Sequence, residues 1–411
     1  MLQKPNKFEK TYYYLILFFA FIMPLSRALV SLFVILLPII WIYEGDFKRK
    51  WQEIKSSKFL LAIILFTFYS SISFFWSENI LEALNQIRLF SYFILIFVIA
   101  TSLQPKYIPQ IITSFLMGMF VSEIIAYGVF FELWTFKHAT VQNPSPFMIH
   151  IDYSVFLAIT SILLLNRLIS SKYTLNEKIL FAFFFCTVTG NLFLTTGRAG
   201  QVALIAGTIV MTLLHFKLTL KSFVLSLFLI GSIYTTAYTL SNSFKIRTAQ
   251  AYSNIEGIIN MNFNSSWGIR AAFWITTYDI LKEHPLGVGI GDFKDETAKI
   301  IEKKKYTFID STTKEFMSTN HPHNEFLLIL LQTGIIGLVL FFYMIYQLYQ
   351  LQIKDKELKE LSILFLTIYF VSCMAEPLLV KQFPIAIFVF FVGVFSTDSL
   401  RNIDKKSELS K

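Results

Sequence analysis

Long apolar runs alternate with short polar links along almost the whole chain. Most runs are about 17 to 25 residues long, which is the length that a helix needs to cross roughly 30 Å of hydrocarbon. Because every backbone polar group must find a partner inside lipid, the pattern predicts an all-α integral membrane protein with about twelve transmembrane helices. The predicted spans are residues 11–26, 28–43, 59–75, 88–103, 108–131, 151–168, 179–195, 200–216, 221–240, 324–350, 360–376 and 383–398.

One link is much longer than the others and divides the chain. A membrane domain over residues 1–240 would contain nine spans, and a second membrane part over 324–398 would contain three. The segment 241–323 between them is polar enough to face water, and we expect short helices in it. Residues 399–411 would form a tail.

Composition and charge agree with lipid as the main solvent. Hydrophobic residues make up 55% of the chain and charged residues only 15%, which leaves more apolar surface than a water-soluble domain can bury. The net charge of +9 comes from dispersed Lys and Arg residues that form no single stripe, so nucleic-acid binding is not indicated. Cys186 and Cys373 both lie inside apolar runs, so neither a disulfide framework nor a thiolate metal site is indicated.

The basic residues of the links predict the orientation, because short cytoplasmic loops collect Lys and Arg. With a cytoplasmic amino terminus, the inner links contain Lys48, Arg49, Lys50, Lys55, Lys58, Lys106, Arg167, Lys172, Lys178, Lys217, Lys221, Lys354, Lys356 and Lys359. The outer short links contain only Arg27, Arg88, Lys137, Arg198 and Lys381. Both termini are therefore predicted in the cytoplasm. The segment 241–323 would face the periplasm, where no nucleoside triphosphate is available and a donor must arrive already activated.

The arginines at outer span ends need an explanation of their own. For Arg27 and Arg88, a long side chain that reaches the lipid headgroups is as good an explanation as a functional role. Arg198 is more specific, because it lies in a hairpin of small residues, Thr195-Thr196-Gly197-Arg198-Ala199-Gly200, that opens the next helix. A guanidinium at a helix amino terminus suits a diphosphate, and the small residues would let backbone approach it. The alternative is a structural turn with an outward arginine.

The long segment contains a second arginine on a predicted helix. Ser265 and Ser266 are suitable N-caps for a helix in which Trp267, Arg270 and Trp274 share one face. That face could lie at the membrane surface, with Arg270 beside a lipid-linked phosphate; a packing face with a solvated arginine explains the spacing as well. The Gly-rich turn over residues 284–291 is weak evidence of phosphate binding, and no strand precedes it, so a dinucleotide-binding fold is not supported.

A histidine pair stands directly before the span 324–350. Pro322 suits the first turn of a helix, which would put His323 at the outer start of that span, where a neutral imidazole can act as a general base. A structural capping histidine is the alternative. His321 and His323 could also bind a metal ion, but no further ligand has a recognisable spacing to them, so we predict no metal site.

With these motifs the chain resembles the O-antigen ligase and polymerase superfamily of bacterial envelope enzymes, most closely the O-antigen ligases. Members are similar in having a cytoplasmic amino terminus, about twelve spans and one large periplasmic loop before a histidine motif. The motifs that carry the resemblance are Thr196-Gly197-Arg198, the helix from Arg270 to Trp274 with the turn His284-Pro285 and Gly287-Val288-Gly289, and His323-Asn324-x-x-Leu327 with Gly334-x-x-Gly337.

The resemblance implies transfer of a polysaccharide from undecaprenyl diphosphate to a sugar of the lipid A core, in the bacterial inner membrane and without metal or other cofactor. The family's essential loop histidine corresponds to His323, and its two essential arginines correspond to Arg198 and Arg270. We hypothesise that His323 is the general base, that both arginines hold the departing diphosphate, and that the anomeric centre is inverted. Further candidates for contact with diphosphate or glycan are Arg27, Arg88, His321, Trp267 and Trp274.

Other functions stay open at this point. A polymerase of the same superfamily and a protein O-oligosaccharyltransferase would have the same motifs, and the sequence contains no recognisable code for the acceptor, the sugars or the oligomeric state. His321, and Thr195-Thr196 where relatives often have Ser-x-Ser, depart from the family pattern. A transporter of lipid-linked glycan would also carry charges inside its spans, here Glu123 and Glu376, but no pair of matched halves is evident.

Overall fold

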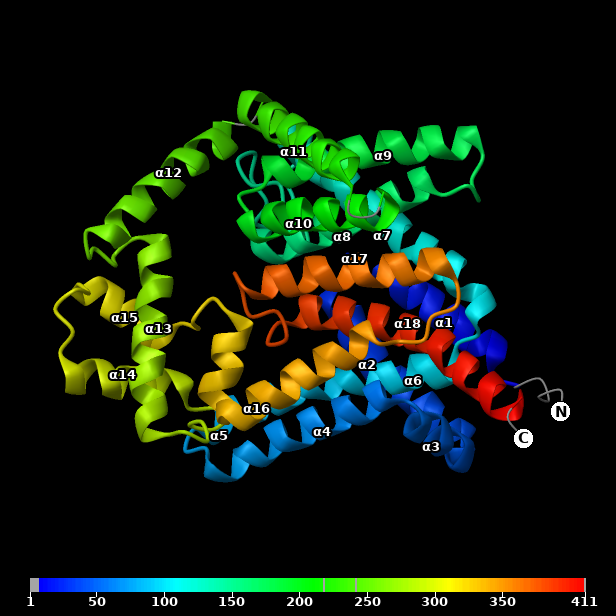
Figure 1. Ribbon diagram of the computed structural model, residues 1–411, viewed down its shortest axis with the longest axis horizontal. Helices are drawn as coiled ribbons and strands as arrows, with labels where there is room; N and C mark the ends of the chain where they lie inside the picture. The colour runs from blue at the N-terminus through cyan, green and yellow to red at the C-terminus, as the bar shows by residue number, and fades with distance from the viewer. Residues whose placement is uncertain (1–6, 217–218, 241, 410–411) are drawn as a thin grey trace.

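The computed structural model describes residues 7–216, 219–240 and 242–409, and in these residues the chain is helical throughout its regular elements. Figure 1 shows a bundle of long helices with a smaller group of helices at one end. The helices are α1 (Glu9–Ile22), α2 (Arg27–Glu44), α3 (Phe47–Ser56), α4 (Lys58–Ile72), η1 (Ser73–Trp76), α5 (Ile80–Phe90), η2 (Ser91–Phe93), α6 (Ile94–Ser102), η3 (Pro105–Tyr107), α7 (Ile108–Phe130), α8 (His150–Ile169), α9 (Leu175–Leu194), α10 (Arg198–Phe216), α11 (Leu220–Leu240), α12 (Asn242–Ile259), α13 (Ser266–Glu283), α14 (Phe293–Lys304), α15 (Ser311–Thr319), α16 (Glu325–Tyr349), α17 (Lys356–Cys373) and α18 (Gln382–Leu409).

Nine helical segments of the described residues are long and apolar enough to cross a membrane. They confirm an all-helical membrane protein, while twelve spans stay a prediction. Two of the remaining predicted spans are not among these nine segments for identifiable reasons. Helix α1 has only 14 residues, and the first turns of α17 carry four charged residues. The segments are Arg27–Glu44, Lys58–Trp76, Ile80–Ser102, Pro105–Phe130, His150–Ile169, Leu175–Leu194, Arg198–His215, Glu325–Tyr349 and Gln382–Arg401.

Some predicted boundaries differ from the structure. The span predicted at 88–103 begins at Ile80, because α5, η2 and α6 continue one another, and Arg88 therefore lies within a helix and not at its outer end. Most of the predicted tail 399–411 is the last part of α18, which runs to Leu409. Lys217, one of the basic residues of the inner links, and the predicted boundary at residue 241 lie outside the described residues.

The core of the bundle surrounds α18. In an 18-residue window of its apolar stretch Gln382–Arg401, 94% of the residues are buried, because this helix is apolar on all sides and therefore needs neighbours on all sides. Aromatic rings fill much of the space around it; for example, the Phe365 ring of α17 lies 4.8 Å from that of Phe391.

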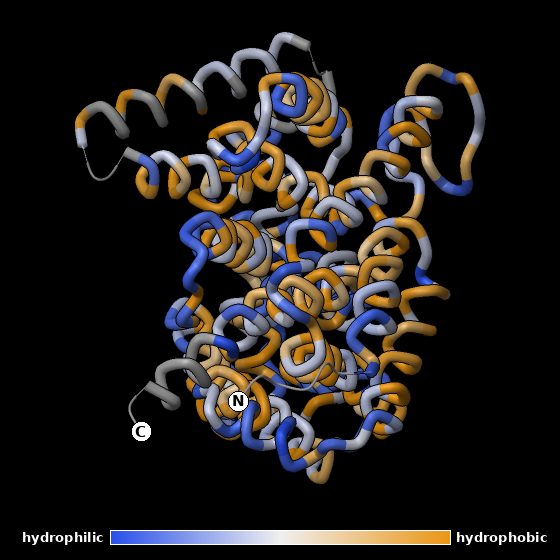
Figure 2. The backbone as a smooth tube through the Cα atoms, turned by 90° about the vertical axis from the view of Figure 1, so that its right-hand side faces the viewer, coloured by the Kyte–Doolittle hydropathy of each residue, from blue (hydrophilic) through white to orange (hydrophobic). Residues whose placement is uncertain are grey.

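Large apolar side chains also lie on the outside of the bundle, where a water-soluble protein would be polar. Figure 2 shows hydrophobic positions along the helices and hydrophilic ones mainly in the links. Apolar surface of this extent is stable against lipid chains. Exposed examples are Leu32, Ile35, Ile39, Phe68, Leu180, Phe183, Ile335, Val339 and Phe342.

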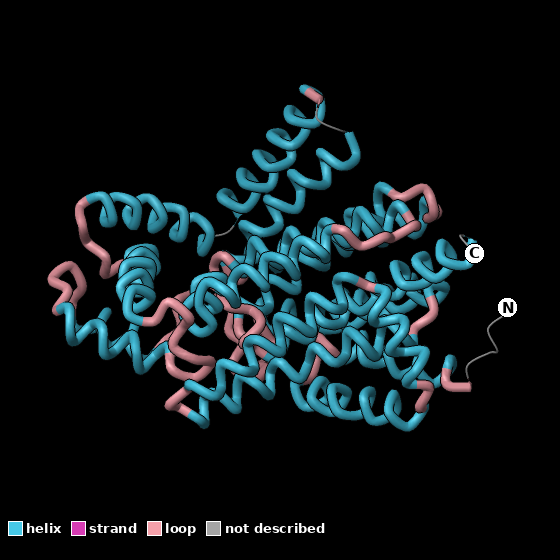
Figure 3. Tube along the Cα trace, turned by 60° about the horizontal axis from the view of Figure 1, so that its bottom comes forward, coloured by secondary structure: helices cyan, strands magenta, loops and turns pink. Residues whose placement is uncertain are grey.

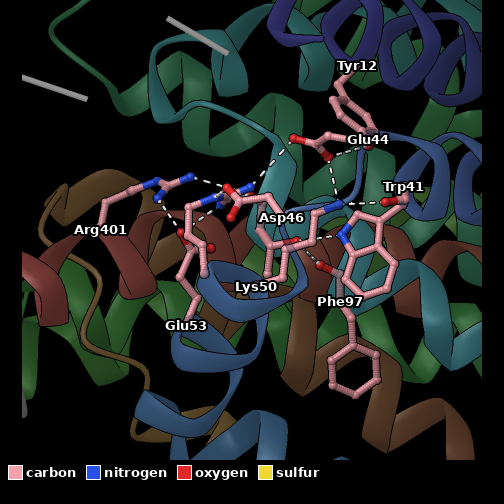
Figure 4. Close-up of polar contacts among 10 residues, drawn as sticks. Tyr12, Trp41, Glu44, Asp46, Lys50, Glu53, Phe97 and Arg401 are labelled. Carbon is pink, nitrogen blue, oxygen red and sulfur yellow. Dashed lines mark hydrogen bonds and ion pairs between the residues drawn. The ribbon is translucent and has the colours of Figure 1, made fainter. Parts of the chain in front are cut away.

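The link predicted between residues 43 and 59 contains the amphipathic helix α3, which we did not predict. Its Lys50 is 1% exposed, and the ammonium lies 2.8 Å from Glu44 Oε2 and over the Trp41 ring. Glu53 of the same helix accepts from Arg49 at 2.8 Å and from Arg401 of α18 at 3.1 Å (Figure 4). This ion cluster joins α2, α3 and α18 at the end of the bundle where α18 ends.

Four helices, α12 to α15, form the group at the other end, opposite the start of α1 and the end of α18 (Figures 1 and 3). They have their own small core, which also includes the first turns of α16. Phe273, Ile280, Phe293, Ile300 and Met317 are buried in it. The predicted helices of segment 241–323 are therefore present in its described part, although α12 and α13 have 18 residues each and are not short.

A break in α16 fixes this group to the bundle. Gly334 has a non-helical backbone with φ 64° and ψ −166°, which interrupts the hydrogen bonds of the helix. The carbonyl oxygens of Leu331 and Gln332 accept instead from the N–H groups of Val288 and Gly289, at 2.9 and 3.0 Å. The Gly-rich turn thus binds a broken helix, and a Cβ at Gly287 would lie 2.4 Å from the Gly334 nitrogen. The phosphate interpretation of this turn finds no support here.

We expect Lys50→Met to lower the free energy of unfolding by about 3 kcal/mol, because a buried carboxylate then loses its ammonium partner. Thermal unfolding in detergent measures the change. Lys48→Met makes the same exchange at an exposed position of α3 and should change stability by less than about 0.5 kcal/mol. Equal unfolding temperatures for the two variants would contradict a stabilising role of the ion cluster.

Gly334→Ala should lower the free energy of unfolding by about 1 to 3 kcal/mol, because only glycine adopts this backbone conformation without strain. In addition, its Cβ would lie 2.4 Å from the carbonyl carbon of Leu286. Gly231→Ala is the control, since a Cβ there meets nothing within 4 Å inside α11 and a helix prefers alanine. We expect Gly231→Ala to unfold at the same temperature as wild type or at a higher one, and Gly334→Ala to unfold at a lower temperature than wild type.

Candidate active site

A cavity of about 700 Å³ lies where α12 to α15 meet the bundle. Side chains from α8, α10, α12, α13, α15 and α17 line it, together with the links before α16 and after α17. It brings together three predicted site residues that are far apart in the sequence, Arg198, Arg270 and His323, and also Trp267. Arg27, Arg88, His321 and Trp274 do not line it.

Arg198 reaches the cavity because the hairpin before it packs tightly on α8. The Gly200 N–H donates to Ser154 Oγ at 3.1 Å, and a Cβ at Gly200 would lie 2.0 Å from the Ser154 carbonyl oxygen. The small residues were predicted to admit a ligand, and instead they admit a neighbouring helix. Thr195 Oγ1 donates to the Leu192 carbonyl, so that hydroxyl is committed to the fold, whereas Thr196 lines the cavity.

Arg270 lies on α13, whose predicted N-cap is confirmed because Ser265 Oγ accepts from the Gly268 N–H at 3.1 Å. Arg270 Nη1 donates to the carbonyl and hydroxyl oxygens of Ser266, at 3.2 and 3.3 Å. Its Nε is buried without a hydrogen-bond partner among the described residues. Burial lowers the pKa of Arg270, and the charge of Glu376 opposes this effect. A buried donor of this kind suits an anion.

Only part of the predicted face of α13 lines the cavity. Trp267 and Arg270 line the cavity, but Trp274 is 52% exposed and lies outside it. Arg27 is exposed and stacks on the Phe383 ring at 5.4 Å, and Arg88 is exposed on α5. The second-rank candidates Arg27, Arg88 and Trp274 therefore do not line this cavity, and their contact with diphosphate or glycan stays a prediction.

His323 precedes its helix and does not belong to the first turn. Asn324 is the N-cap of α16, since its Oδ1 accepts from the Leu327 N–H at 2.9 Å, and the helix begins at Glu325. Asparagine is among the best N-caps, which explains why Pro322 is not the first helical residue as predicted. His323 has a left-handed backbone with φ 51°, and its ring stacks on Phe316 with a centroid distance of 5.9 Å.

Glu376, in the link after α17, is the main residue that the sequence did not reveal as part of the site. Its Oε2 lies 2.7 Å from His323 Nδ1, and its Oε1 lies 3.3 Å from His321 Nε2 and 2.5 Å from Lys381 Nζ. Its side chain is 2% exposed. The available indication was its position at the end of predicted span 360–376, because outer span ends meet in space.

The charges around Glu376 set its ionisation. Burial alone would raise the pKa of this carboxyl, but the hydrogen bond with His323 and the charges of Lys381 and the two histidines lower the pKa to about 2. Burial lowers the pKa of His321 to about 4, so that imidazole is neutral at neutral pH. Glu376 is therefore a carboxylate that orients the His323 ring, and His323, not His321, faces the cavity.

The same three side chains have the composition of a metal site. Ligand atoms of His321, His323 and Glu376 all lie within 4.8 Å of one another. The histidine pair was not expected to bind metal because no further ligand was recognisable, and Glu376 lies close enough to both rings to serve as a third ligand. The prediction that the protein needs no metal ion is not tested by this geometry.

A comparison with known protein families gives a match over a segment that contains several residues of this site. Residues 181–342 match the family model described as O-antigen ligase. This part of the chain is similar to the O-antigen ligase family. The matched residues include Arg198, Arg270 and His323, and the match confirms the resemblance drawn from the motifs. The matched family is one of enzymes that transfer glycans and use lipid-linked substrates. A comparison with curated proteins gives no match.

Glu376→Gln should destabilise the protein at neutral pH but not in acid. Since the folded state holds the pKa of Glu376 below its ordinary value, the carboxylate stabilises the fold above that value, and the contribution is lost as pH falls from about 4.5 to about 2. The difference in unfolding temperature between wild type and variant should be constant between about pH 7 and 5 and shrink below about 4.5. Glu315→Gln, at an exposed position of α15, should show no such difference.

Proposed function

We propose that the protein is an O-antigen ligase that transfers a polysaccharide from undecaprenyl diphosphate to a sugar of the lipid A core. The observation that carries the proposal is the cavity shared by two arginines and a carboxylate-oriented histidine. The match of residues 181–342, which include both arginines and the histidine, to the O-antigen ligase family supports the assignment. A polymerase or a protein O-oligosaccharyltransferase would use the same donor groups and differ in the acceptor.

The donor explains the chemistry of the cavity. Besides the two guanidinium groups, which suit a diphosphate, the cavity has a largely apolar lining that suits the first isoprene units of a lipid carrier. The buried Nε of Arg270 gains an oxygen partner when the diphosphate binds. The apolar lining consists of Ile151, Ala199, Val202, Ile258, Ile269, Val371, Met374 and Ala375.

In the proposed reaction, His323 is the general base. Glu376 accepts the Nδ1–H, which leaves the lone pair of Nε2 for the hydroxyl proton of the acceptor. The acceptor oxygen bonds to the anomeric carbon while the bond from that carbon to the diphosphate oxygen breaks, with inversion. The electron pair leaves on the diphosphate, which Arg198 and Arg270 stabilise, and Glu376 stabilises the imidazolium that forms. No step requires a nucleotide or a metal ion.

We further propose twelve spans in the bacterial inner membrane, both termini in the cytoplasm, and the cavity on the periplasmic side. The domain limits would be 1–240, 241–323, 324–398 and 399–411, as inferred from the sequence. The position of α12 to α15 at the end of the bundle opposite the start of α1 and the end of α18 supports this orientation.

His323→Ala and Arg198→Ala should each lower glycan transfer about 100-fold or more, because a general base and an oriented charge each contribute about 10² or more to the rate. Arg270→Ala should have a similar effect. Release of undecaprenyl diphosphate from lipid-linked glycan, with lipid A-core as acceptor, measures the reaction in detergent. The control is His284→Ala, since His284 is half exposed and lies outside the cavity. Near-normal transfer by a folded His323→Ala protein would refute the mechanism.

The acceptor is best identified by deletion of the gene and examination of the envelope glycolipids. Rough lipopolysaccharide with polymer accumulated on its lipid carrier is expected for a ligase. Core that bears a single repeat would identify a polymerase, and loss of protein glycans alone would identify a protein-glycosylating enzyme. Movement of lipid-linked glycan across vesicles without any bond cleavage would identify a transporter.

A further inference from the structure

The cluster of His321, His323 and Glu376 has a use beyond general base catalysis. We propose that it binds a divalent cation of the zinc class and that the bound ion switches off His323 by changing its tautomer. The second half of this inference rests on the proposed function, whereas the first half concerns binding alone.

The distances in the cluster are close to those of a coordinated ion. A zinc ion bound at about 2.0 to 2.1 Å separates tetrahedral ligand atoms by about 3.4 Å. His321 Nε2 lies 3.3 Å from Glu376 Oε1, and His323 Nδ1 lies 2.7 Å from Glu376 Oε2. Small rotations of the two rings, each 23 to 25% exposed, are enough to admit an ion.

The ligand types select the class of ion. Two imidazoles and one carboxylate form the protein set of an open zinc site, in which a water completes the tetrahedron. Calcium and magnesium prefer oxygen ligands in larger number, so they do not suit this cluster. Zinc, and cobalt as its spectroscopic substitute, are the ions to test.

Lys381 opposes such an ion and also limits its effect on the fold. Its ammonium bonds to Glu376 Oε1, so a cation that approaches this carboxylate meets a positive charge. Asp152 Oδ1 lies 3.4 Å from the same ammonium and remains as a counter-ion when Glu376 turns to the metal. We therefore expect reversible binding and not the tight binding of a structural zinc site.

The consequence for catalysis follows from the two nitrogens of the His323 ring. A neutral imidazole has one N–H and one lone pair. In the metal-free site Nδ1 carries the hydrogen toward Glu376, and Nε2 carries the lone pair. When the ion takes a lone pair at Nδ1, the hydrogen moves to Nε2, which can no longer accept the acceptor's proton. No atom is gained or lost, because the proton only changes nitrogen.

On binding the ion, His321 changes its tautomer in the same way and loses only one weak hydrogen bond. Its Nδ1 accepts from the His323 N–H at 3.4 Å, a long contact, so its hydrogen lies on Nε2. Binding of the ion at Nε2 moves this hydrogen to Nδ1 and gives up only that weak bond. His321 thus contributes to the ion and not to the cavity, which explains a polar ring that the proposed reaction does not use.

Binding is tested with the full chain, purified in detergent without a polyhistidine tag and treated with a chelator. Titration with Co²⁺ should give the visible absorption of a four-coordinate ion, and His321→Gln should weaken this binding at least about tenfold. His284→Gln, in a histidine outside the cluster, should bind like wild type. Absence of the absorption in the wild-type protein, or equal binding by His321→Gln, would overturn the site.

Inhibition is tested on the same preparations, with each rate divided by that of the same variant without metal. Zinc should lower transfer by wild type, a chelator should restore it, and His321→Gln should need at least about tenfold more zinc for the same inhibition. Activation by zinc, or binding of cobalt with no effect of zinc on transfer, would overturn the tautomer mechanism. If the metal-free protein transfers no glycan, the proposed function fails, and the cobalt titration still decides the metal site.

Discussion

The break in α16 is the constraint on which the active-site geometry depends. Inside a membrane protein an interrupted helix leaves carbonyl groups without partners, and these must be satisfied by other parts of the protein. At Gly334 the turn of Val288 and Gly289 provides the missing donors, and Gln332 Nε2 returns a bond to the Ile290 carbonyl. Because this turn follows α13 directly, the same bonds fix the position of Arg270 over the end of the bundle.

A second constraint is the buried negative charge at the opposite wall of the cavity. Glu376 and Lys381 both come from the link between α17 and α18, and His323 comes from the link before α16. A carboxylate so little exposed is stable only with several partners, so its ionisation draws these two chain segments together. The hydrogen bond that satisfies the carboxylate also orients the imidazole, so under the proposed function one interaction would contribute to both the stability of the site and its reactivity.

The sequence predicted the parts of the molecule that depend on local patterns. Apolar runs predicted the long helices, the Ser265 cap predicted the start of α13, and the motifs with the family resemblance singled out Arg198, Arg270 and His323, which line one cavity. It did not predict what depends on packing between distant segments. Helix α3 appeared only as a charged link, because its burial depends on partners in α2 and α18. Glu376 appeared as an isolated charge, because no spacing joins it to His323 53 residues earlier.

The glycines of the two Gly-rich elements permit close packing between chain segments and not direct contact with a ligand. Gly197 and Gly200 were expected to admit a ligand, and the turn with Gly287 and Gly289 was weak evidence of phosphate binding, but all four glycines lie where a Cβ would collide with another segment. Close packing of the hairpin on α8 directs Arg198 into the cavity, and close packing of the turn on α16 positions α13 with Arg270. The glycines thus help to bring two guanidinium groups from separate segments to one cavity, and under the proposed function their combined positive charge would stabilise the diphosphate there.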